Sequence, residues 1–345
     1  MKKSLLALAV LGAFAGTAAA QSSVTIYGVV DLAITKGNGG TAANPGANGL
    51  SEAWIQKQST TSRLGFRGNE DLGGGLSAQF QIEHRFNPDT GAVNDTNVFW
   101  AGRSYVQLTS AAAGAVYLGR EYSPEFWLAV KSDPFGWDGV GQISSMQYAG
   151  YSDAANCSVN GSSVRTSNTV GYKSPSLGGL TFNGAVSLGE GAAGCGRTQA
   201  FNLEYAAGPI YAGLGYSKAS QGAADGNSLV NLAVHYNFGV VKPMLYYARA
   251  KTNGGNNTNK VIELAATAPL GNGVLKAAWA RLDPQGANNT ATKIGLGYNY
   301  NLSKRTKVYT YYTKVDNKAG ASYGPGITRA GDDFSSVALG VRHNF

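Results

Sequence analysis

Apolar and polar side chains alternate along much of this chain with a period of two residues. Between Leu76 and Phe86 the even-numbered positions are mostly apolar, whereas every odd-numbered position is polar. Near the C-terminus, Val337, Leu339 and Val341 alternate in the same way with small or charged residues. A period of two places the two sets of side chains on opposite faces of a β-strand. The pattern therefore predicts strands with one apolar face and one polar face.

Sixteen segments follow this pattern. They cover residues 23–36, 53–68, 75–86, 96–109, 115–121, 163–174, 179–189, 197–207, 209–219, 227–238, 240–252, 259–268, 273–283, 291–301, 305–316 and 334–345. Open twisted sheets rarely hold so many strands, and closing the sheet into a barrel removes its unpaired edges. The segments therefore favour a closed, antiparallel barrel.

The connections between these segments alternate in length. Short turns such as 68–75, 110–114 and 268–273 alternate with longer stretches rich in Gly, Asn and Ala, such as 37–52 and 317–333. Transmembrane barrels combine short periplasmic turns with long external loops in this way. The sequence thus predicts an all-β fold, a 16-stranded antiparallel transmembrane β-barrel in the outer membrane. Its apolar face meets lipid, and its polar face lines a water-filled lumen.

Composition agrees with this prediction. The chain has 48 glycines in 345 residues, 43% hydrophobic residues and a mean hydropathy of −0.15. So much glycine disfavours a helical protein, and no apolar run beyond the N-terminus is long enough for a membrane-spanning helix. Residues 1–20 combine two lysines, a short apolar core and a run of alanines, as a cleaved signal peptide does. We expect residues 21–345 to form a single exported barrel domain.

The chain contains two cysteines, Cys157 and Cys195, both in polar, Gly-rich stretches. Export to an oxidising compartment makes a disulfide between them the natural pairing, and two separate free thiols are the alternative. Neither cysteine has neighbours at a zinc-ligand spacing, and we expect no metal site and no cofactor. Although the net charge is +8, the charged residues alternate with lipid-facing ones, so nucleic acid is not an expected partner.

The connection over 121–162 is about forty residues long and carries Phe126, Trp127, Phe135 and Trp137. Bulky apolar groups are poor choices for a solvated loop of this length. We expect this third external loop to fold into the lumen and narrow it. An external lid or a contact between subunits is the alternative.

Charged residues near this loop are candidates for a pore constriction. Strand parity points Arg63, Arg67, Arg85 and Arg103 inward to form a basic wall. The acidic candidates are Glu83 on the wall and Glu125, Asp133 and Asp138 on the loop. Charges of opposite sign across a narrow gap create a transverse field, and such charges set pore selectivity. Solvated lumen charges without a special role are the alternative.

Several segments resemble those of one family. The hairpin SRLGFRGNEDLGGGL at 62–76 resembles the second hairpin of Gram-negative general porins of the betaproteobacterial type. The stretches 24–31, 119–124, 303–306 and 340–345 are similar to that family's first strand, constriction-loop entry, last turn and final strand. The resemblance implies a homotrimer that passes ions and small hydrophilic solutes by diffusion, with a weak anion preference. It also implies that terminal Phe345 is recognised by the barrel-assembly machinery.

Other functions receive less support from the sequence. His84, His235 and His343 lie on three separate segments without a nucleophile motif, which argues against an enzyme. A substrate-specific channel for a sugar or an aromatic solute is the main alternative, with Trp127, Trp137 and Tyr148 as its binding track. The same aromatic residues could instead anchor the loop to the wall. Lipopolysaccharide is the expected partner for some exposed Lys and Arg side chains near the outer rim.

Overall fold

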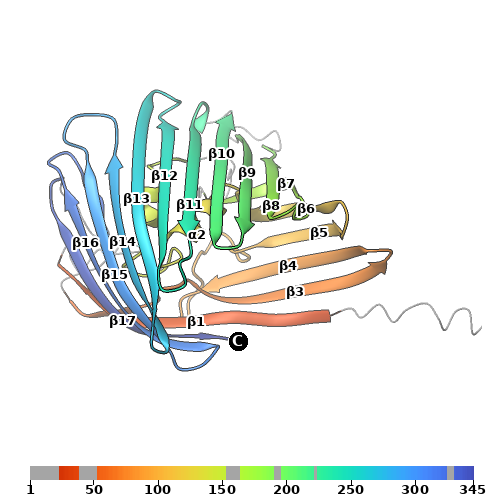
Figure 1. The fold of residues 1–345 in the computed structure, drawn as a ribbon, viewed down its shortest axis with the longest axis horizontal. Helices are drawn as coiled ribbons and strands as arrows, with labels where there is room; N and C mark the ends of the chain where they lie inside the picture. Colours follow the sequence, from red (N-terminus) through yellow and green to blue (C-terminus); the bar gives the residue numbers. More distant parts are fainter. Residues whose placement is uncertain (1–22, 39–52, 153–163, 190–195, 221–223, 325–329) are drawn as a thin grey trace, which may run out of the picture.

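A computed structural model describes residues 23–38, 53–152, 164–189, 196–220, 224–324 and 330–345. The proposed signal peptide and both cysteines, Cys157 and Cys195, lie outside the described residues. Within these ranges nearly all regular structure is β-strand, arranged as one strongly curved sheet (Figure 1). In the described part of the chain, no helix is long and apolar enough to span a membrane.

In the described residues, the sheet contains sixteen long strands and one short strand. Their bounds are β1 (Ser23–Gly37), β2 (Ile55–Lys57), β3 (Ser62–Gly73), β4 (Leu76–Phe86), β5 (Ser104–Ser110), β6 (Gly114–Tyr122), β7 (Arg165–Lys173), β8 (Leu180–Ser187), β9 (Arg197–Ala207), β10 (Ile210–Ser220), β11 (Ser228–Tyr236), β12 (Lys242–Thr252), β13 (Asn257–Leu270), β14 (Gly273–Asp283), β15 (Ala291–Asn301), β16 (Thr306–Asn317) and β17 (Phe334–Asn344). Two short helices, α2 (Phe126–Ser132) and α3 (Ser144–Gln147), lie between β6 and β7.

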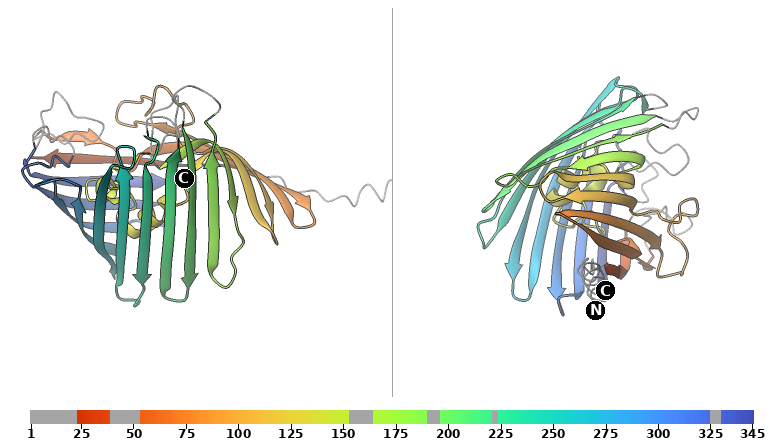
Figure 2. Two further views of the ribbon diagram at one scale, coloured as in Figure 1. Left: turned by 90° about the horizontal axis from the view of Figure 1, so that it is seen from above. Right: turned by 90° about the vertical axis from the view of Figure 1, so that its right-hand side faces the viewer.

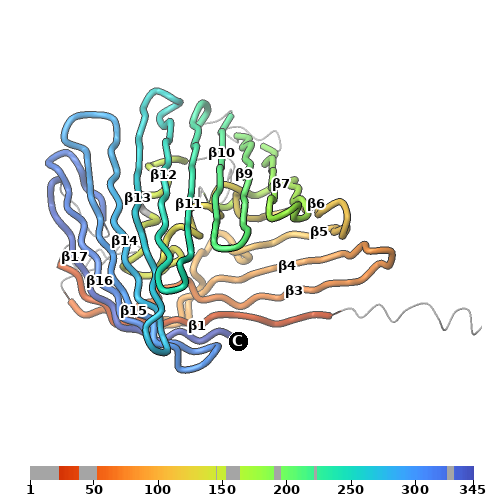
Figure 3. The backbone as a smooth tube through the Cα atoms, in the orientation of Figure 1, coloured from red at the N-terminus to blue at the C-terminus, as the bar shows by residue number. Residues whose placement is uncertain are grey.

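Pairing between the two ends of the chain closes the barrel. Every long strand pairs antiparallel with its sequence neighbour, and β1 pairs with both β3 and β17. The amide of Gly28 donates to the carbonyl of Phe345 at 3.1 Å, and the amide of Phe345 donates back at the same distance. The C-terminus therefore lies beside β1 (Figure 3). The predicted closed, antiparallel sixteen-stranded barrel is confirmed.

The alternating pattern sorts side chains between the two faces as expected. On β17, Leu339 is 64% exposed on the outer face, whereas its neighbour Ala338 is buried on the inner face. His84 and His343 also lie with the outward-facing residues, whereas His235 is buried on the inner side against Ser132 of α2. A continuous apolar outer surface suits contact with lipid, where every backbone polar group must be paired internally.

Two predicted strands, over 53–68 and 96–109, differ from the structure in their bounds. In the first, β3 also continues to Gly73, beyond the predicted end at 68. The predicted strand over 96–109 begins only at Ser104. Phe99 and Trp100 precede it in an irregular loop, where Phe99 stacks on His84 with ring centroids 4.3 Å apart. The apolar residues that imitated a strand pattern thus pack on the outside of β4. The predicted strand over 53–68 is divided into β2 and β3, which both pair with β1. Between them the Gln58 side chain accepts the Ser62 amide, and the pairing with β1 is interrupted.

Four inward-facing tyrosine rings lie over glycines on the neighbouring strand. The register pairs are Tyr27 with Gly65, Tyr117 with Gly171, Tyr309 with Gly340, and Tyr311 with Gly297. A Cβ atom built on any of these glycines would lie within 2.5 Å of the tyrosine ring. A large ring covering a glycine on the adjacent strand supplies the packing that glycine lacks.

We predict that Gly171→Ala destabilises the barrel by about 1–3 kcal/mol, because the added methyl group displaces the buried Tyr117 ring. The midpoint of thermal or urea unfolding of the folded protein measures this change. In a Tyr117→Ala background the same substitution should cost much less. Equal losses in the two backgrounds would show that the ring is not the cause.

Candidate functional site

A cavity of about 540 Å³ lies between the inner wall and the loop that carries α2 and α3. The wall contributes residues of β1, β3 and β4, and the loop contributes Trp127 and Trp137. Five guanidinium groups line this cavity, those of Arg63, Arg85, Arg103, Arg165 and Arg342. Among the described residues, its lining contains two carboxylates, Glu83 and Asp138. The cavity therefore joins three of the four predicted basic residues with two of the four predicted acidic ones.

Glu83 balances two arginines within the wall. Arg63 and Arg85 are direct partners in the pairing of β3 with β4, a position where like charges repel. The Glu83 carboxylate lies 2.5 Å from the Arg85 guanidinium and 3.8 Å from that of Arg63. It also accepts the Tyr27 hydroxyl at 3.1 Å and is only 3% exposed. Glu83 thus stabilises the basic wall from within.

Arg103, immediately before β5, is held by a second buried carboxylate. Its guanidinium donates to Glu121 at 2.7 Å and to the Gln81 side chain at 3.2 Å. It also lies over the Tyr105, Tyr122 and Trp127 rings, 5.4–5.7 Å from their centroids. Glu121 is fully buried and also pairs with Lys173 at 3.2 Å. The sequence analysis did not select Glu121, although it lies on the inward face of β6.

The sequence analysis did not select two of the five cavity arginines, Arg165 and Arg342. Arg342 donates to Thr60 at 2.9 Å and to Asp138 at 3.1 Å. Arg342 follows Ala338 and Gly340 on the inward face, so the alternation along β17 was sufficient to predict that its side chain faces the lumen. Arg165 lies over the Tyr122 ring, 4.3 Å from its centroid. Asn168 adopts a φ of +54° and breaks the alternation of buried and exposed residues along β7. The sequence pattern therefore could not predict which face of the strand Arg165 occupies.

Arg67 lies outside the cavity lining. It is exposed on the inward face of β3, with its guanidinium 5.4 Å from the Tyr27 ring centroid. It lies four positions after Arg63, a rise of roughly 13 Å along a strand. Arg67 therefore extends the basic wall toward the short-turn end of the barrel.

The loop carboxylates occupy different environments. Asp138 reaches the cavity, but Asp133 and Glu125 are buried beneath the loop, which differs from the expectation that they face the passage. The Asp133 carboxylate accepts the amides of Phe135, Trp137 and Ile143 at 2.9–3.1 Å, and burial raises its pKa to about 6. Asp133 therefore fixes the fold of the loop.

Glu125 contacts the wall instead of the cavity. Its side chain accepts the Ser123 hydroxyl, and its backbone carbonyl accepts the Asn231 side-chain amide at 3.0 Å. A Cβ atom on Gly215 would lie 2.7 Å from that of Glu125, so the glycine allows this close approach. Glu125 thus belongs to the contact between the loop and strands β10 and β11.

The loop packs against the inward-facing residues of β10 to β16, inside the curve of the sheet (Figure 2). Leu128 covers Gly213, and Phe135 packs edge-on against Tyr311 with ring centroids 5.1 Å apart. Gln147 donates to Glu263 at 2.7 Å, and its carbonyl accepts the Tyr246 hydroxyl at 3.1 Å. Apolar packing and buried hydrogen bonds together hold the loop in this position.

The aromatic residues of the loop form one cluster. Trp137 lies 4.7 Å from Phe126 and 5.4 Å from Tyr148, measured between ring centroids. Tyr148 is only 6% exposed and does not line the cavity. The contacts of Trp137 and Tyr148 therefore support the anchor interpretation over a binding track.

Five further basic residues lie on strands β12, β14 and β16, where apolar and polar positions alternate poorly in the sequence, and the structure assigns each to one face of the barrel. Lys242, Lys276 and Lys307 face inward, and the Lys276 ammonium lies 5.5 Å from the Phe135 ring centroid. Arg249 and Arg281 are exposed on the outer face, each between buried inward-facing neighbours.

Comparisons with known proteins agree with this geometry. Residues 7–320 match the model of the family described as Gram-negative porin. The chain is 35% identical to outer membrane porin protein 32 of Delftia acidovorans and 30% identical to an outer membrane porin protein of Bordetella pertussis. Each alignment covers the full length of both chains.

Solved structures give the same result. The anion-selective porin from Comamonas acidovorans superposes with a TM-score of 0.79 at 30% identity, covering 94% of this chain and all of that one. Salmonella typhi OmpF superposes with a TM-score of 0.68 at 16% identity, covering 93% of this chain and 97% of that one, and supports the fold alone. On its barrel, its charged inner wall and these full-length relatives, the chain belongs to the Gram-negative porin family of the outer membrane.

Proposed function

We propose that this porin forms a water-filled channel through which ions and small hydrophilic solutes diffuse, with a preference for anions. The observation that carries the proposal is the imbalance of charge in the cavity, where five arginines accompany two carboxylates. Focused by low-dielectric walls, such an excess raises the local concentration of anions. The anion-selective relative from Comamonas acidovorans supports the same sign of preference.

The loop is proposed to narrow the channel. Its helices pack on one side of the inner wall, and the arginines line the gap that remains on the other side. The charges therefore act where a passing solute comes closest to the protein. A ring or row of charge at a narrow point has most influence on selectivity.

We further propose that the protein assembles as a homotrimer and contacts lipid and lipopolysaccharide through its apolar outer surface. Phe345, which is 42% exposed on the outer side of the barrel seam, is the proposed contact for the barrel-assembly machinery. The disulfide between Cys157 and Cys195 and the cleavage of residues 1–20 also remain proposals.

The charge proposal predicts that replacing Arg63→Gln together with Arg342→Gln shifts the reversal potential in a KCl gradient toward cations. Two of the five positive charges are lost, and Asp138 loses its 3.1 Å partner, so the chloride preference should fall roughly severalfold. Planar-bilayer recordings of the refolded protein measure the shift.

The matched control is Arg249→Gln with Arg281→Gln, which removes the same charge from the outer face. This control should leave the reversal potential close to that of the unmodified protein. A similar shift in both variants, or none in the first, would contradict the assignment of selectivity to the cavity.

The loop proposal predicts that Asp133→Ala loosens the loop, because three buried amides lose their acceptor and each costs about 1–3 kcal/mol. We expect proteases to cut between residues 123 and 164 and single-channel conductance to become larger and noisier. In Asp138→Ala, whose carboxylate contacts Arg342 instead of the loop backbone, the loop should stay protected while selectivity changes. Protection of the loop in Asp133→Ala would refute this role.

A further inference from the structure

Two lysines on the inner face of the barrel converge on one amide group. Lys276 lies on β14 and Lys307 on β16, and Asn299 lies on β15 between them. When its nitrogen donates to the Tyr311 hydroxyl at 2.7 Å, the Asn299 oxygen accepts both ammonium groups, each at 3.2 Å. The reverse orientation would turn the amide nitrogen, a donor, toward two other donors. The two ammonium groups therefore lie close enough together to contact one small anion.

Protein carboxylates do not neutralise this lysine pair. Among the residues that the structure describes, no carboxylate forms an ion pair with Lys276 or Lys307. Two carboxylates lie in the neighbourhood, but both have other partners. Asp138 pairs with Arg342, and Asp31 is buried and accepts a tyrosine hydroxyl. The lysine pair therefore keeps an excess of positive charge.

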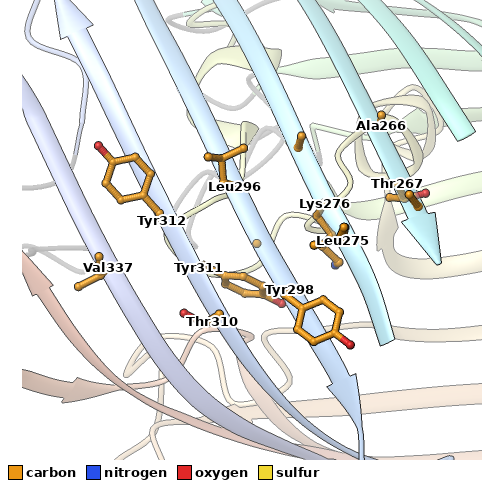
Figure 4. Close-up of a pocket in the computed structure, with 13 residues that line it drawn as sticks. Ala266, Thr267, Leu275, Lys276, Leu296, Tyr298, Thr310, Tyr311, Tyr312 and Val337 are labelled. Carbon is orange, nitrogen blue, oxygen red and sulfur yellow. The ribbon is translucent and has the colours of Figure 1, made fainter. Parts of the chain in front are cut away.

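Aromatic rings border the lysine pair. The Lys276 ammonium lies 5.5 Å from the ring centroid of Phe135, on the loop, and 5.9 Å from that of Tyr311. Figure 4 shows Lys276 and Tyr311 on either side of β15. The Lys307 ammonium lies 5.9 Å from the Tyr309 centroid. Cations are attracted to the faces of such rings, so the rings restrict both side chains without removing their charge. Both lysines are only half-buried and remain accessible from the lumen.

The lysine pair lies beside the arginine-lined cavity, near the short-turn end of the barrel. Lys307 is the register partner of Arg342, which lines that cavity, whereas neither lysine belongs to its lining. β14 begins three residues before Lys276 and β16 one residue before Lys307, each directly after a short turn. Like charges directly opposite each other on neighbouring strands are destabilising. An anion bound between Lys307 and Arg342 would relieve that repulsion.

We propose that Lys276 and Lys307 form a second anion site, outside the arginine-lined cavity, that binds the phosphate group of a small solute. A phosphate group carries roughly −1.5 to −2 charges at pH 7 and has several acceptor oxygens. It therefore balances both ammonium groups and leaves an oxygen for Arg342. Charge-assisted hydrogen bonds of this kind are about twice as strong as neutral ones. The inference rests on the proposed channel function and names the chemical class of one of its solutes.

The test measures how inorganic phosphate reduces the chloride current through single channels of the full mature protein in planar bilayers. We expect Lys276→Gln/Lys307→Gln to raise the half-inhibitory phosphate concentration roughly tenfold, because charge-assisted contacts with phosphate are lost. Asn299→Asp keeps both lysines but places a carboxylate at the point where they converge. This second variant should raise the half-inhibitory concentration to a similar extent.

The matched control is Lys131→Gln/Lys242→Gln, which removes two other lysines that line a separate cavity of about 380 Å³. Lys242 lies two strands from Lys276, roughly 10 Å away, where salt screens its charge. We expect this control to have nearly the half-inhibitory concentration of the unmodified protein. Acetate, a monoanion, should inhibit the unmodified channel much less than phosphate does. An equal shift in the control, equal inhibition by acetate, or no inhibition by phosphate would overturn the site.

Two further measurements separate the sources of phosphate and the two proposals. Inhibition by glycerol phosphate that also depends on Lys276 and Lys307 would extend the site to phosphate monoesters, whereas inhibition by inorganic phosphate alone would restrict it to the free ion. Reversal potentials in a KCl gradient without phosphate report the proposed anion preference independently. Absence of that preference, together with phosphate inhibition that depends on the two lysines, would contradict the proposed selectivity and support this site.

Discussion

Pairing of the first strand with the last is the constraint on which the rest of the structure depends. In lipid, an unpaired backbone amide or carbonyl costs several kcal/mol, so a membrane-spanning sheet must leave no edge. The hydrogen bonds between Gly28 and Phe345, together with the register of β1 on β17, meet this requirement. Once the ring is closed, period-two alternation decides for every strand which side chains meet lipid and which meet water.

The inner wall then supports two different kinds of packing. On one side, small residues such as Gly213 and Gly215 let the loop approach the wall, and buried hydrogen bonds fix it there. On the other side, Glu83 pairs with Arg63 and Arg85, and Glu121 pairs with Arg103 and Lys173. Both carboxylates are nearly inaccessible to solvent. Burying a carboxylate behind the arginines keeps them charged and oriented, while the side chains facing the water stay mainly positive. The division of the lumen into an apolar side and a basic side is therefore built into the strands.

Much of the barrel followed from the sequence, because one rule applies to every strand. The alternation located the strands and placed Arg63 and Arg85 on the inner wall. It also indicated that Arg342 faces inward, although the sequence analysis did not select this residue. The alternation predicted too early a start for the strand over 96–109, because Phe99 and Trp100 pack on His84 instead of belonging to β5. It could not orient Arg165, since a single left-handed residue, Asn168, precedes the regular part of β7. The loop obeys no such period, so the burial of Asp133 and Glu125 depends on tertiary contacts that composition does not reveal.

The tyrosines that cover glycines on adjacent strands also affect the shape of the lumen. A tyrosine standing upright on a strand would project its ring toward the axis of the barrel. Here Tyr27, Tyr117, Tyr309 and Tyr311 lie over bare backbone instead, so their bulk covers the wall. Because each glycine lacks a Cβ atom, the tyrosine ring can lie closer to the wall there than it could over any other residue. The bore of the channel is set in part by residues that have no side chain.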